Sequence, residues 1–396
     1  MKPVESRMDK ILFLEWKSFG NDHMIREFRQ EGYEVILFDF PRETEDMRFS
    51  QGLTEKLTMA ILKEQPAFVF SFNYFPVAAI ACKAARTKYV SWIYDSPYIL
   101  MYSQTIFYDT NRVFLFDRAE CEKFRSMGAS HVYYLPMAAA VDYYDQIKPE
   151  SRHHELYDSD VTFIGSMYSE KRQHLFRHLE DLDVYTRGYL DGVMQVQKNV
   201  YGMDILEESL TPEIVENMRK VCPVTEHGDG IETVEWVFAN YFLARKVTAT
   251  ERAEVLSALS EICDVKLFTP EPTPQLAKVE NMGKLDYYTQ APYAMKCAKI
   301  NLNISLRSIH TGMPLRAMDI LGCGGFLLTN YQADFFEYFE PGKDFVYYSN
   351  INEIPQLVNY YLNHEEERKE IAQNGYNKVR QHLSYRKQVK ALLGLI

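Results

Sequence analysis

Short apolar runs alternate with amphipathic stretches along the first third of the chain. The runs have the length of buried strands, and the stretches between them repeat their apolar residues at helical spacing. Predicted strands cover residues 10–15, 33–39, 67–72, 89–94, 112–117 and 131–136, and predicted helices cover 21–31, 53–65, 76–86 and 118–127. This alternation predicts a parallel sheet with helices on both faces. Ligands of such sheets bind beyond the carboxyl ends of the strands.

The same alternation returns after residue 158. Predicted strands cover residues 160–166, 264–269, 299–305 and 326–329, with predicted helices at 250–261 and 291–298. Residues 184–249 have a mostly helical pattern and are expected to form an insertion between two strands. We therefore predict an α/β protein with two doubly wound, Rossmann-like domains. The first covers residues 1–150 and the second 158–378, with a polar linker at 146–159.

Length and composition fit this architecture. A chain of 396 residues suits two domains, and 46% hydrophobic and 25% charged residues are ordinary for a globular protein. The net charge of −11 argues against nucleic acid as a partner. Six scattered cysteines without a Cys-x-x-Cys pair argue against a zinc site and for a reducing compartment, so a cytoplasmic location is expected. Residues 1–7 are polar, and no apolar run is long enough to span a membrane.

Residues 308–330 organise the second half of the chain. They are expected to form a turn, a short helix, a glycine break and a buried strand. Pro314 suits the first helical position because its missing N–H would be unpaired there. Leu315, Met318 and Leu321 form an apolar stripe at helical spacing, and glycines from Gly322 onwards end the helix.

Arg316 and Asp319 are the candidate ligand-binding residues of this helix. They are three residues apart and so share one face. A helix N-terminus favours a phosphate, and the Arg316 guanidinium adds a forked donor that fits one. Asp319, one turn deeper, can accept hydrogen bonds from the two hydroxyls of a ribose. The alternative interpretation is an ordinary Arg–Asp surface pair, which is common and contributes little stability.

Three segments carry a resemblance to a known family. They are Asp319-Ile-Leu-Gly-Cys-Gly-Gly325, Phe339-Glu-Pro-Gly-Lys-Asp-Phe-Val-Tyr-Tyr348 and Glu365-Glu-Glu-Arg-Lys-Glu-Ile-Ala-Gln-Asn-Gly375. From Ser308 to about Arg386 the chain resembles the nucleotide-binding half of GT-B glycosyltransferases of the "glycosyl transferases group 1" clan. It is most similar to the spore maturation protein CgeB-like family. Many retaining members carry two glutamates separated by seven residues; here Asp319 takes the second place and Thr311 the first, so the resemblance does not imply a retaining mechanism.

The resemblance implies a glycosyltransferase whose two domains face a cleft. The C-terminal domain would hold a nucleotide sugar, expected to be a UDP-sugar, and the N-terminal domain the acceptor. A C-terminal helix at residues 379–396 would pack back on the N-terminal domain. Arg316, Arg307 and the N–H groups near Gly312 would stabilise the leaving diphosphate without a metal or other cofactor.

Further donor contacts are expected from the resemblance. Gly165 and Ser166 would touch the donor phosphates, although a simple strand–helix turn explains them equally well. The nucleotide base would lie near Thr269 and the loop at residues 285–287. His310, beside Thr311, is a reserve candidate for a catalytic base.

Candidate acceptor-side residues follow strands of the first predicted sheet: His23 after the first strand, Asn73 after the third and Asp95 after the fourth. A carboxylate at such an edge can act as a base or orient an acceptor hydroxyl, so Asp95 is the first choice. Asp95-Ser-Pro is also ordinary turn chemistry. Asn73-Tyr-Phe-Pro and Trp92-Ile-Tyr-Asp-Ser-Pro97 resemble the N-terminal domain of the CgeB-like family, which favours Asn73 and Asp95.

Two other functions stay open at this stage. One is a nucleotide-sugar epimerase or hydrolase on the same fold, and the other is a non-catalytic sugar-nucleotide-binding subunit, which the Thr311 departure favours. The run Glu226-His-Gly-Asp229 has metal-capable side chains but no partner cluster at ligand spacing, so no metal is predicted. The sequence leaves the sugar, the acceptor, the stereochemical outcome and the oligomeric state open.

Overall fold

The computed structural model describes residues 8–396, and the polar stretch at residues 1–7 lies outside this range. The chain forms two compact units. Unit 1 contains residues up to Met137, Glu226–Glu232 and Tyr385–Ile396, and unit 2 contains Ala138–Thr225 and Thr233–Ser384. The first unit thus ends before the polar stretch expected as a linker. That stretch holds helix α6 (Ser151–Tyr157) and belongs to unit 2.

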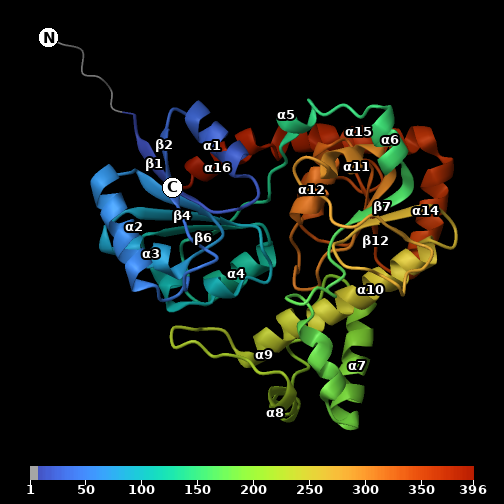
Figure 1. Ribbon diagram of the computed structural model, residues 1–396, viewed down its shortest axis with the longest axis horizontal. Coiled ribbons are helices and arrows are strands. Elements are labelled where there is room, and N and C mark those ends of the chain that lie inside the picture. The colour runs from blue at the N-terminus through green and yellow to red at the C-terminus, as the bar shows by residue number, and fades with distance from the viewer. Residues whose placement is uncertain (1–7) are drawn as a thin grey trace. The chain divides into compact units, whose positions relative to one another are not determined.

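Unit 1 is built on a six-stranded parallel sheet with the order β2-β1-β3-β4-β5-β6. Its strands are β1 (Lys10–Glu15), β2 (Glu34–Asp39), β3 (Phe68–Phe72), β4 (Lys88–Ile93), β5 (Asn111–Leu115) and β6 (Val132–Tyr134). Its helices are α1 (Asn21–Gln30), α2 (Gln51–Glu64), α3 (Pro76–Ala84), α4 (Arg118–Ser126) and α16 (Tyr385–Leu393), with short 3₁₀ turns η1 (Ile99–Met101) and η2 (Gln104–Phe107). Helix α2 packs beside α3, and α1 beside α16 (Figure 1). The strand order reverses between β1 and β3, which marks the edge where ligands of such folds bind.

Two segments distant in sequence complete unit 1. Helix α16 packs on α1. Gly20, just before α1, leaves room for the Tyr385 hydroxyl, because a side chain on residue 20 would occupy the same space. Residues 226–232, a segment we call the strap, add the carboxylates of Asp229 and Glu232 to the buried Arg48 guanidinium, at 3.0 and 3.4 Å. The Ser103 hydroxyl also donates to Asp229, at 2.5 Å. The strap, considered above for a metal, is thus engaged in ion pairs within unit 1.

Unit 2 repeats the architecture with the strand order β12-β11-β10-β7-β8-β9, all parallel. Its strands are β7 (Ser159–Ile164), β8 (Val265–Phe268), β9 (Glu280–Asn281), β10 (Ala298–Asn303), β11 (Leu327–Asn330) and β12 (Val346–Tyr348). Helices packed around this sheet are α5 (Val141–Tyr144), α6, α11 (Ala291–Cys297), α12 (Leu315–Gly322), α13 (Phe335–Tyr338), α14 (Ile354–Asn363) and α15 (Glu365–His382), with the 3₁₀ turn η5 (Ile351–Glu353). Here the order reverses between β7 and β10.

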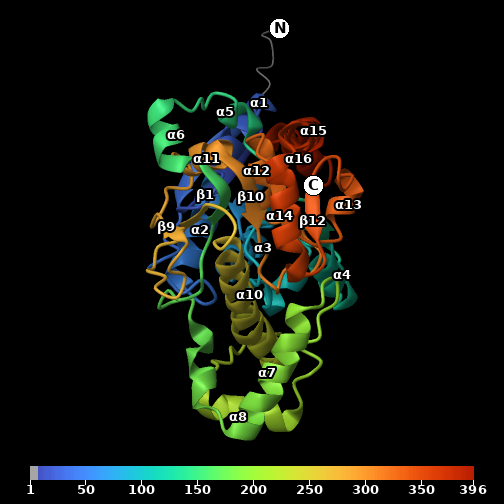
Figure 2. The same cartoon turned by 90° about the vertical axis from the view of Figure 1, so that its right-hand side faces the viewer.

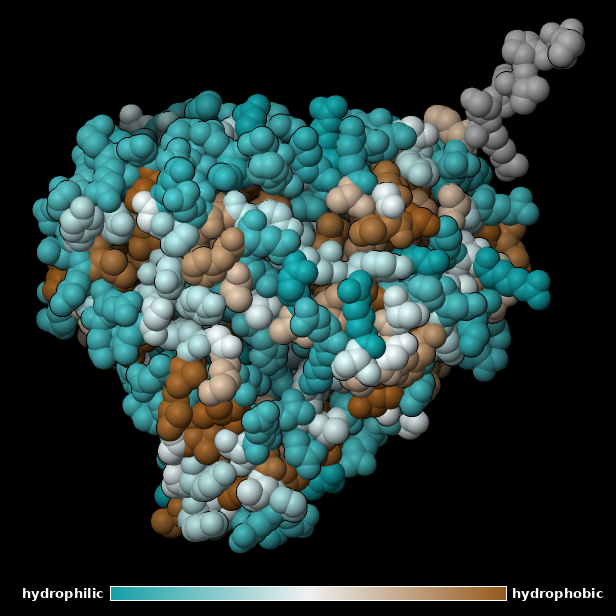
Figure 3. All heavy atoms as spheres, turned by 180° about the vertical axis from the view of Figure 1, so that it is seen from behind, coloured by the Kyte–Doolittle hydropathy of each residue, from teal (hydrophilic) through white to brown (hydrophobic). Residues whose placement is uncertain are grey.

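A helical insertion separates β7 from β8. It contains η3 (Leu175–Asp181), α7 (Val184–Lys198), α8 (Pro212–Val221), α9 (Val234–Val237), the π-helical turn η4 (Phe238–Leu243) and α10 (Ala244–Leu259). Figure 2 shows α10 running from the sheet into the insertion, with α8 at its far end. Val184, Tyr185, Val196 and Met203 are exposed there, and hydrophobic surface is visible on the projecting insertion in Figure 3.

Several boundaries differ from the sequence expectations. The helix expected at 250–261 begins earlier, at Ala244, and continues directly from α9 and η4, which lie in the stretch expected to be mostly helical. The C-terminal helix expected at 379–396 is divided between α15 and α16, because the helical hydrogen bonding stops at Leu383 and Ser384. Within residues 8–396, none of the helices combines the length and the apolar character that crossing a membrane requires.

Candidate functional site

The carboxyl ends of β7 and β10 meet where the strand order of unit 2 reverses. Gly165 follows β7 directly, and Arg316 reaches it from the first turn of α12. A Cβ atom placed on Gly165 would lie 2.8 Å from Nη2 of Arg316. The structure therefore brings together Gly165 and Arg316, two of the predicted donor-binding residues, at the edge where ligands of doubly wound sheets bind.

Arg316 is oriented by the last residue of β10. Its Nη1 donates to Oδ1 of Asn303 at 3.0 Å, and the Asn303 amide in turn donates to the hydroxyls of Ser305 and Thr329. Its guanidinium carbon lies 5.1 Å from the Phe163 ring centroid. Burial, followed by repulsion from Arg252, lowers the pKa of Arg316 to about 10. The group is still cationic at neutral pH, and burial would strengthen its attraction for an anion.

Arg252 of α10 is a second cation at this edge, and the sequence analysis missed it. It is 2% exposed and donates to the carbonyl oxygens of Ser166 at 2.5 Å and Ile304 at 2.6 Å. It therefore joins the ends of β7 and β10. In the part of the chain that the structure describes, neither Arg252 nor Arg316 pairs with a carboxylate. A charged residue on the apolar face of a predicted amphipathic helix was the available signal.

The turn after β7 presents a hydroxyl and an aromatic ring beside these cations. Ser166 Oγ accepts a hydrogen bond from the Tyr168 backbone N–H at 2.8 Å and donates to Glu170 at 2.7 Å. The guanidinium carbons of Arg252 and Arg245 lie 5.0 and 6.0 Å from the centroid of the Tyr168 ring. Three guanidinium groups thus surround the turn that Gly165 and Ser166 begin, which is an arrangement suited to a polyanionic ligand.

Asp319 lies one helical turn beyond Arg316 and is 3% exposed. Its two carboxylate oxygens accept hydrogen bonds from the hydroxyls of Tyr144 and Tyr287 at 2.7 and 2.6 Å. Burial raises the pKa of Asp319 to about 7, and the two tyrosine hydrogen bonds act in the opposite direction. Arg316 and Asp319 therefore do not form the surface ion pair that was the alternative interpretation.

Arg307 is placed differently from the expectation. Its Nε donates to Oε2 of Glu251 at 2.9 Å, and its two terminal nitrogens donate to the carbonyl oxygens of Val200 and Lys198. Its guanidinium carbon also lies 3.8 Å from the Tyr201 ring centroid. Each guanidinium nitrogen is thus engaged inside unit 2. This geometry does not support Arg307 as a phosphate ligand, and instead it fastens the insertion to the end of β10.

The other predicted donor residues lie around the same edge. Thr269 directly follows β8, and its Oγ1 is buried without a hydrogen-bond partner. Gly312 is buried just before α12, and the Thr311 carbonyl accepts the Asp334 N–H at 3.0 Å. His310 Nδ1 lies 3.9 Å from Asp204 of the loop that follows α7.

Unit 1 brings together Asn73 and Asp95. The Asn73 amide nitrogen donates to Oδ2 of Asp95 at 2.8 Å, and its oxygen accepts the backbone N–H groups of Tyr94 and Asp95. Asn73 has a φ of 57°, which Asn tolerates better than most residues. Burial raises the pKa of Asp95, and Arg42 acts in the opposite direction. His23 packs instead on Tyr385, with ring centroids 5.3 Å apart.

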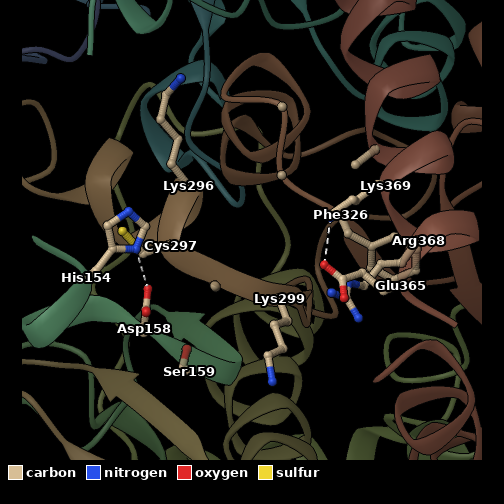
Figure 4. A pocket seen from close by; sticks show the side chains of 14 residues that line it. His154, Asp158, Ser159, Lys296, Cys297, Lys299, Phe326, Glu365, Arg368 and Lys369 are labelled. Atoms are coloured by element: carbon tan, nitrogen blue, oxygen red, sulfur yellow. Dashed lines mark hydrogen bonds and ion pairs between the residues drawn. The ribbon is translucent and has the colours of Figure 1, made fainter. Parts of the chain in front are cut away.

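A cavity of about 430 Å³ lies at the opposite edge of the second sheet, where β7 and β10 begin (Figure 4). His154, Asp158 and Cys297 offer ligand atoms there within 4.8 Å of one another. His154 and Asp158 are exposed and hydrogen-bond each other at 2.8 Å. This cavity is separate from the Arg316 site, and its cationic residues Lys299 and Lys369 pair with Asp160 and Glu365.

Residues 246–394 match the family profile described as "Glycosyl transferase-like". A comparison with curated protein sequences finds no match.

Solved structures share the fold along nearly the whole chain. One is Anabaena HepE in complex with UDP-glucose, with a TM-score of 0.56, 13% identity and coverage of 98% of this chain and 99% of that one. Another is sucrose-phosphate synthase from Thermosynechococcus elongatus, with a TM-score of 0.57, 8% identity and 98% coverage of both chains. A third is a putative UDP-N-acetylglucosamine 2-epimerase from Listeria monocytogenes, with a TM-score of 0.50, 10% identity and coverage of 98% and 96%.

At identities this low, the similarity shows the fold alone. The shared fold confirms the predicted GT-B class, and each of its two parallel sheets has six strands here. The family match covers α12 and the Arg252 and Arg316 positions. Together, the profile match over residues 246–394 and the GT-B fold of the described chain identify a glycosyltransferase.

Proposed function

We propose that this protein transfers a sugar from a UDP-sugar bound at the Arg316 edge of unit 2 to an acceptor bound by unit 1. The observation that carries the proposal is the pair of buried guanidinium groups, Arg252 and Arg316, at the turn that begins with Gly165. Neither has a carboxylate partner among residues 8–396. Buried cations without counterions are costly, and a pyrophosphate would neutralise them.

The rest of the site supports a nucleoside diphosphate over a simple anion. The first backbone N–H groups of α12 favour a phosphate at the same place. Asp319, one turn further, would accept the ribose hydroxyls. Thr269 Oγ1, buried without a partner, lies at the neighbouring strand end, where the base is expected. The complex of HepE with UDP-glucose is consistent with a UDP-sugar as the donor class.

The chemistry that these residues supply is stabilisation of a leaving diphosphate. When the bond between sugar and diphosphate breaks, negative charge grows on the phosphate oxygens. Arg316 and Arg252 are already oriented by Asn303 and by backbone carbonyls, so little reorganisation would be needed as the charge develops. We therefore propose a transfer in which arginine side chains supply this charge, without a catalytic metal.

Asp95 is the proposed base or acceptor-orienting group of unit 1. Asn73 fixes one of its oxygens, and burial raises its pKa towards the range that suits a general base. His310 and His23 are second-choice candidates for the same role. The similarity to the CgeB-like family and a cytoplasmic location belong to the same proposal.

The direct test is Arg316→Ala, with Arg380→Ala as its matched control. Arg380 forms a surface pair with Asp145 at 2.7 Å, outside the site. Arg316→Ala is expected to weaken UDP binding about 10- to 100-fold, the typical effect of a lost charged hydrogen bond, and to remove most transfer. Arg380→Ala should leave both unchanged. Equal UDP affinity of the wild type and Arg316→Ala in calorimetry would overturn the donor site.

The alternative function is that of a nucleotide-sugar epimerase, because a putative UDP-N-acetylglucosamine 2-epimerase shares the fold. Incubation of the protein with UDP-sugars in the absence of an acceptor separates the two functions. A C2-epimeric product would favour the epimerase, and a sugar attached to an added acceptor would favour the transferase. Binding of UDP without any product would indicate a non-catalytic subunit.

A further inference from the structure

Two tyrosine hydroxyls hold the Asp319 carboxylate from two separate segments. Tyr144, the last residue of α5, donates to Oδ1 at 2.7 Å. Tyr287, in the loop between β9 and α11, donates to Oδ2 at 2.6 Å. Because each carboxylate oxygen has its own phenolic donor, the plane of the carboxylate is fixed.

Packing holds Tyr144 at this place. Gly322, three residues after Asp319 on α12, faces the same segment: a Cβ there would lie 2.6 Å from Cβ of Ala139 and 3.3 Å from the Tyr144 ring. A glycine at this position lets residues 139–144 lie directly against α12. The Tyr144 side chain is buried, so its hydroxyl has little freedom to turn away from Asp319.

The Tyr287 loop is held by a turn of its own. The Asp286 carboxylate accepts the backbone N–H groups of Tyr288 at 3.1 Å and Thr289 at 2.7 Å. This turn fixes the backbone on one side of Tyr287 and directs its side chain towards α12.

The arrangement leaves the carboxylate able to bind a ligand. Each carboxylate oxygen can accept two hydrogen bonds, and each receives one from a tyrosine. One acceptor position per oxygen remains, and two acceptor positions side by side match the adjacent hydroxyls of a ribose.

We propose that Tyr144 and Tyr287 are positioning residues that orient the Asp319 carboxylate for the two hydroxyls of a nucleotide ribose. The ribose part of this inference rests on the proposed function. The two tyrosines act through Asp319 and do not themselves touch the reacting atoms.

The same hydrogen bonds adjust the charge of Asp319. Burial raises its pKa to about 7, whereas the bonds from Tyr287 and Tyr144 favour the charged form. The other ionisable groups nearby are Cys323 on α12, whose thiol pKa burial and Asp319 raise, and Arg316, whose charge acts on Tyr287. Lys296 lowers and Asp145 raises the pKa of the Cys323 thiol. Loss of either tyrosine hydroxyl should therefore raise the pKa of Asp319 further.

The variants are Tyr144→Phe and Tyr287→Phe, with Tyr376→Phe as the matched control. Tyr376 also donates to an aspartate in unit 2, Asp145, at 2.8 Å, but outside the site. Calorimetry at pH 7.5 is expected to show UDP binding weakened about 10-fold in each of the first two variants. The control should bind as the wild type does. We also expect the midpoint of the pH dependence of UDP affinity to move to higher pH in both variants. A merely structural role of the two tyrosines would not move this midpoint.

A second measurement needs no nucleotide. In protein labelled with ¹³C at aspartate carboxyls, the Asp319 signal is assigned by its absence in Asp319→Asn and titrated by NMR. Its midpoint should move to higher pH in Tyr144→Phe and Tyr287→Phe and stay unchanged in Tyr376→Phe. Unmoved midpoints in both variants would overturn the inference, whatever the nucleotide does. Moved midpoints in a protein that binds no UDP would support the tyrosine contacts but overturn the proposed function and the ribose role.

Discussion

The backbone of Gly165 lies directly against the guanidinium of Arg316, so that a single methyl group on Gly165 would come within 2.8 Å of Nη2. The same methyl group would lie 3.1 Å from the Phe163 ring. A side chain on residue 165 would therefore require the Arg316 guanidinium to shift. This relationship gives a test of the donor site that removes no charged group.

Gly165→Ala should displace the Arg316 side chain and lower sugar transfer. A misplacement of about 1 Å in a binding group costs roughly 100-fold in rate, and we expect a loss of this order. The measurement is kcat/KM for the UDP-sugar together with UDP affinity.

Gly188→Ala is the matched control for this change. Gly188 lies on α7, and a Cβ there meets nothing within 4 Å, so activity should be unchanged. If Gly165→Ala folds and turns over as the wild type does, the close approach of Arg316 has no part in donor binding.

Asp95→Asn should separate acceptor chemistry from donor binding. The variant keeps the shape of the side chain but cannot accept a proton, so transfer should fall by about 100-fold or more. UDP affinity should not change, because the donor-binding residues belong to unit 2. The exposed Asp109→Asn is the control.

In the wild type, the acid limb of the pH–rate profile should lie above the ordinary range for an aspartate, because burial raises the pKa of Asp95. A variant that retains full transfer would remove Asp95 from the chemistry.

The sequence pattern predicts the strands of this protein and some of the residue pairs at their ends. Short apolar runs were sufficient to predict the six strands of the first sheet and four strands of the second, since parallel strands need buried faces on both sides. Strands β9 and β12 were not predicted, because runs of two and three residues are too short to show a pattern. Gly165 and Arg316 meet because the topology brings the strand ends together, and Asn73 and Asp95 meet in the same way in unit 1.

Other residues depend on packing that local pattern does not encode. Arg307 follows a strand as a ligand-binding residue would, yet it turns to Glu251, Val200 and Lys198, which belong to the insertion. In the sequence, Arg252 is one of several charged residues of an amphipathic helix. In the structure it lies between two strand ends and donates to the carbonyl oxygens of Ser166 and Ile304. Tyr144 and Asp319 hydrogen-bond across 175 residues of sequence, and neither has a neighbouring residue that would indicate it.

The pairing of the strap with Arg48 should stabilise unit 1. Arg48 is 2% exposed and holds Asp229 and Glu232, so Arg48→Ala would leave two carboxylates in a partly buried place without a cation. Breaking a buried pair from one side costs about 3–5 kcal/mol. We expect a lower melting temperature and faster proteolytic cleavage within residues 226–232.

Lys10→Ala tests whether any lost ion pair has this effect. Lys10 pairs with Glu64 at 2.9 Å, with both side chains about one-fifth exposed at 20% and 21%. Such pairs contribute about 0–1 kcal/mol, so this variant should melt close to the wild type. Equal losses in the two variants would show that the strap adds no particular stability.

His23 should make unit 1 sensitive to acid. Burial, with a smaller contribution from Arg26, lowers the pKa of His23 to about 4. The unfolded chain binds the proton near the ordinary value of about 6.5, so between pH 6.5 and 4 the unfolded state carries more protons than the folded one. Stability is therefore lost as pH falls through this window, whereas above it His23 is neutral in both states and has no effect. His23→Gln should melt closer to the wild type at pH 7.5 than at pH 4.5, where the wild type should be the less stable of the two. A His23→Gln difference that is constant from pH 7.5 to 4.5 would contradict the buried, neutral histidine.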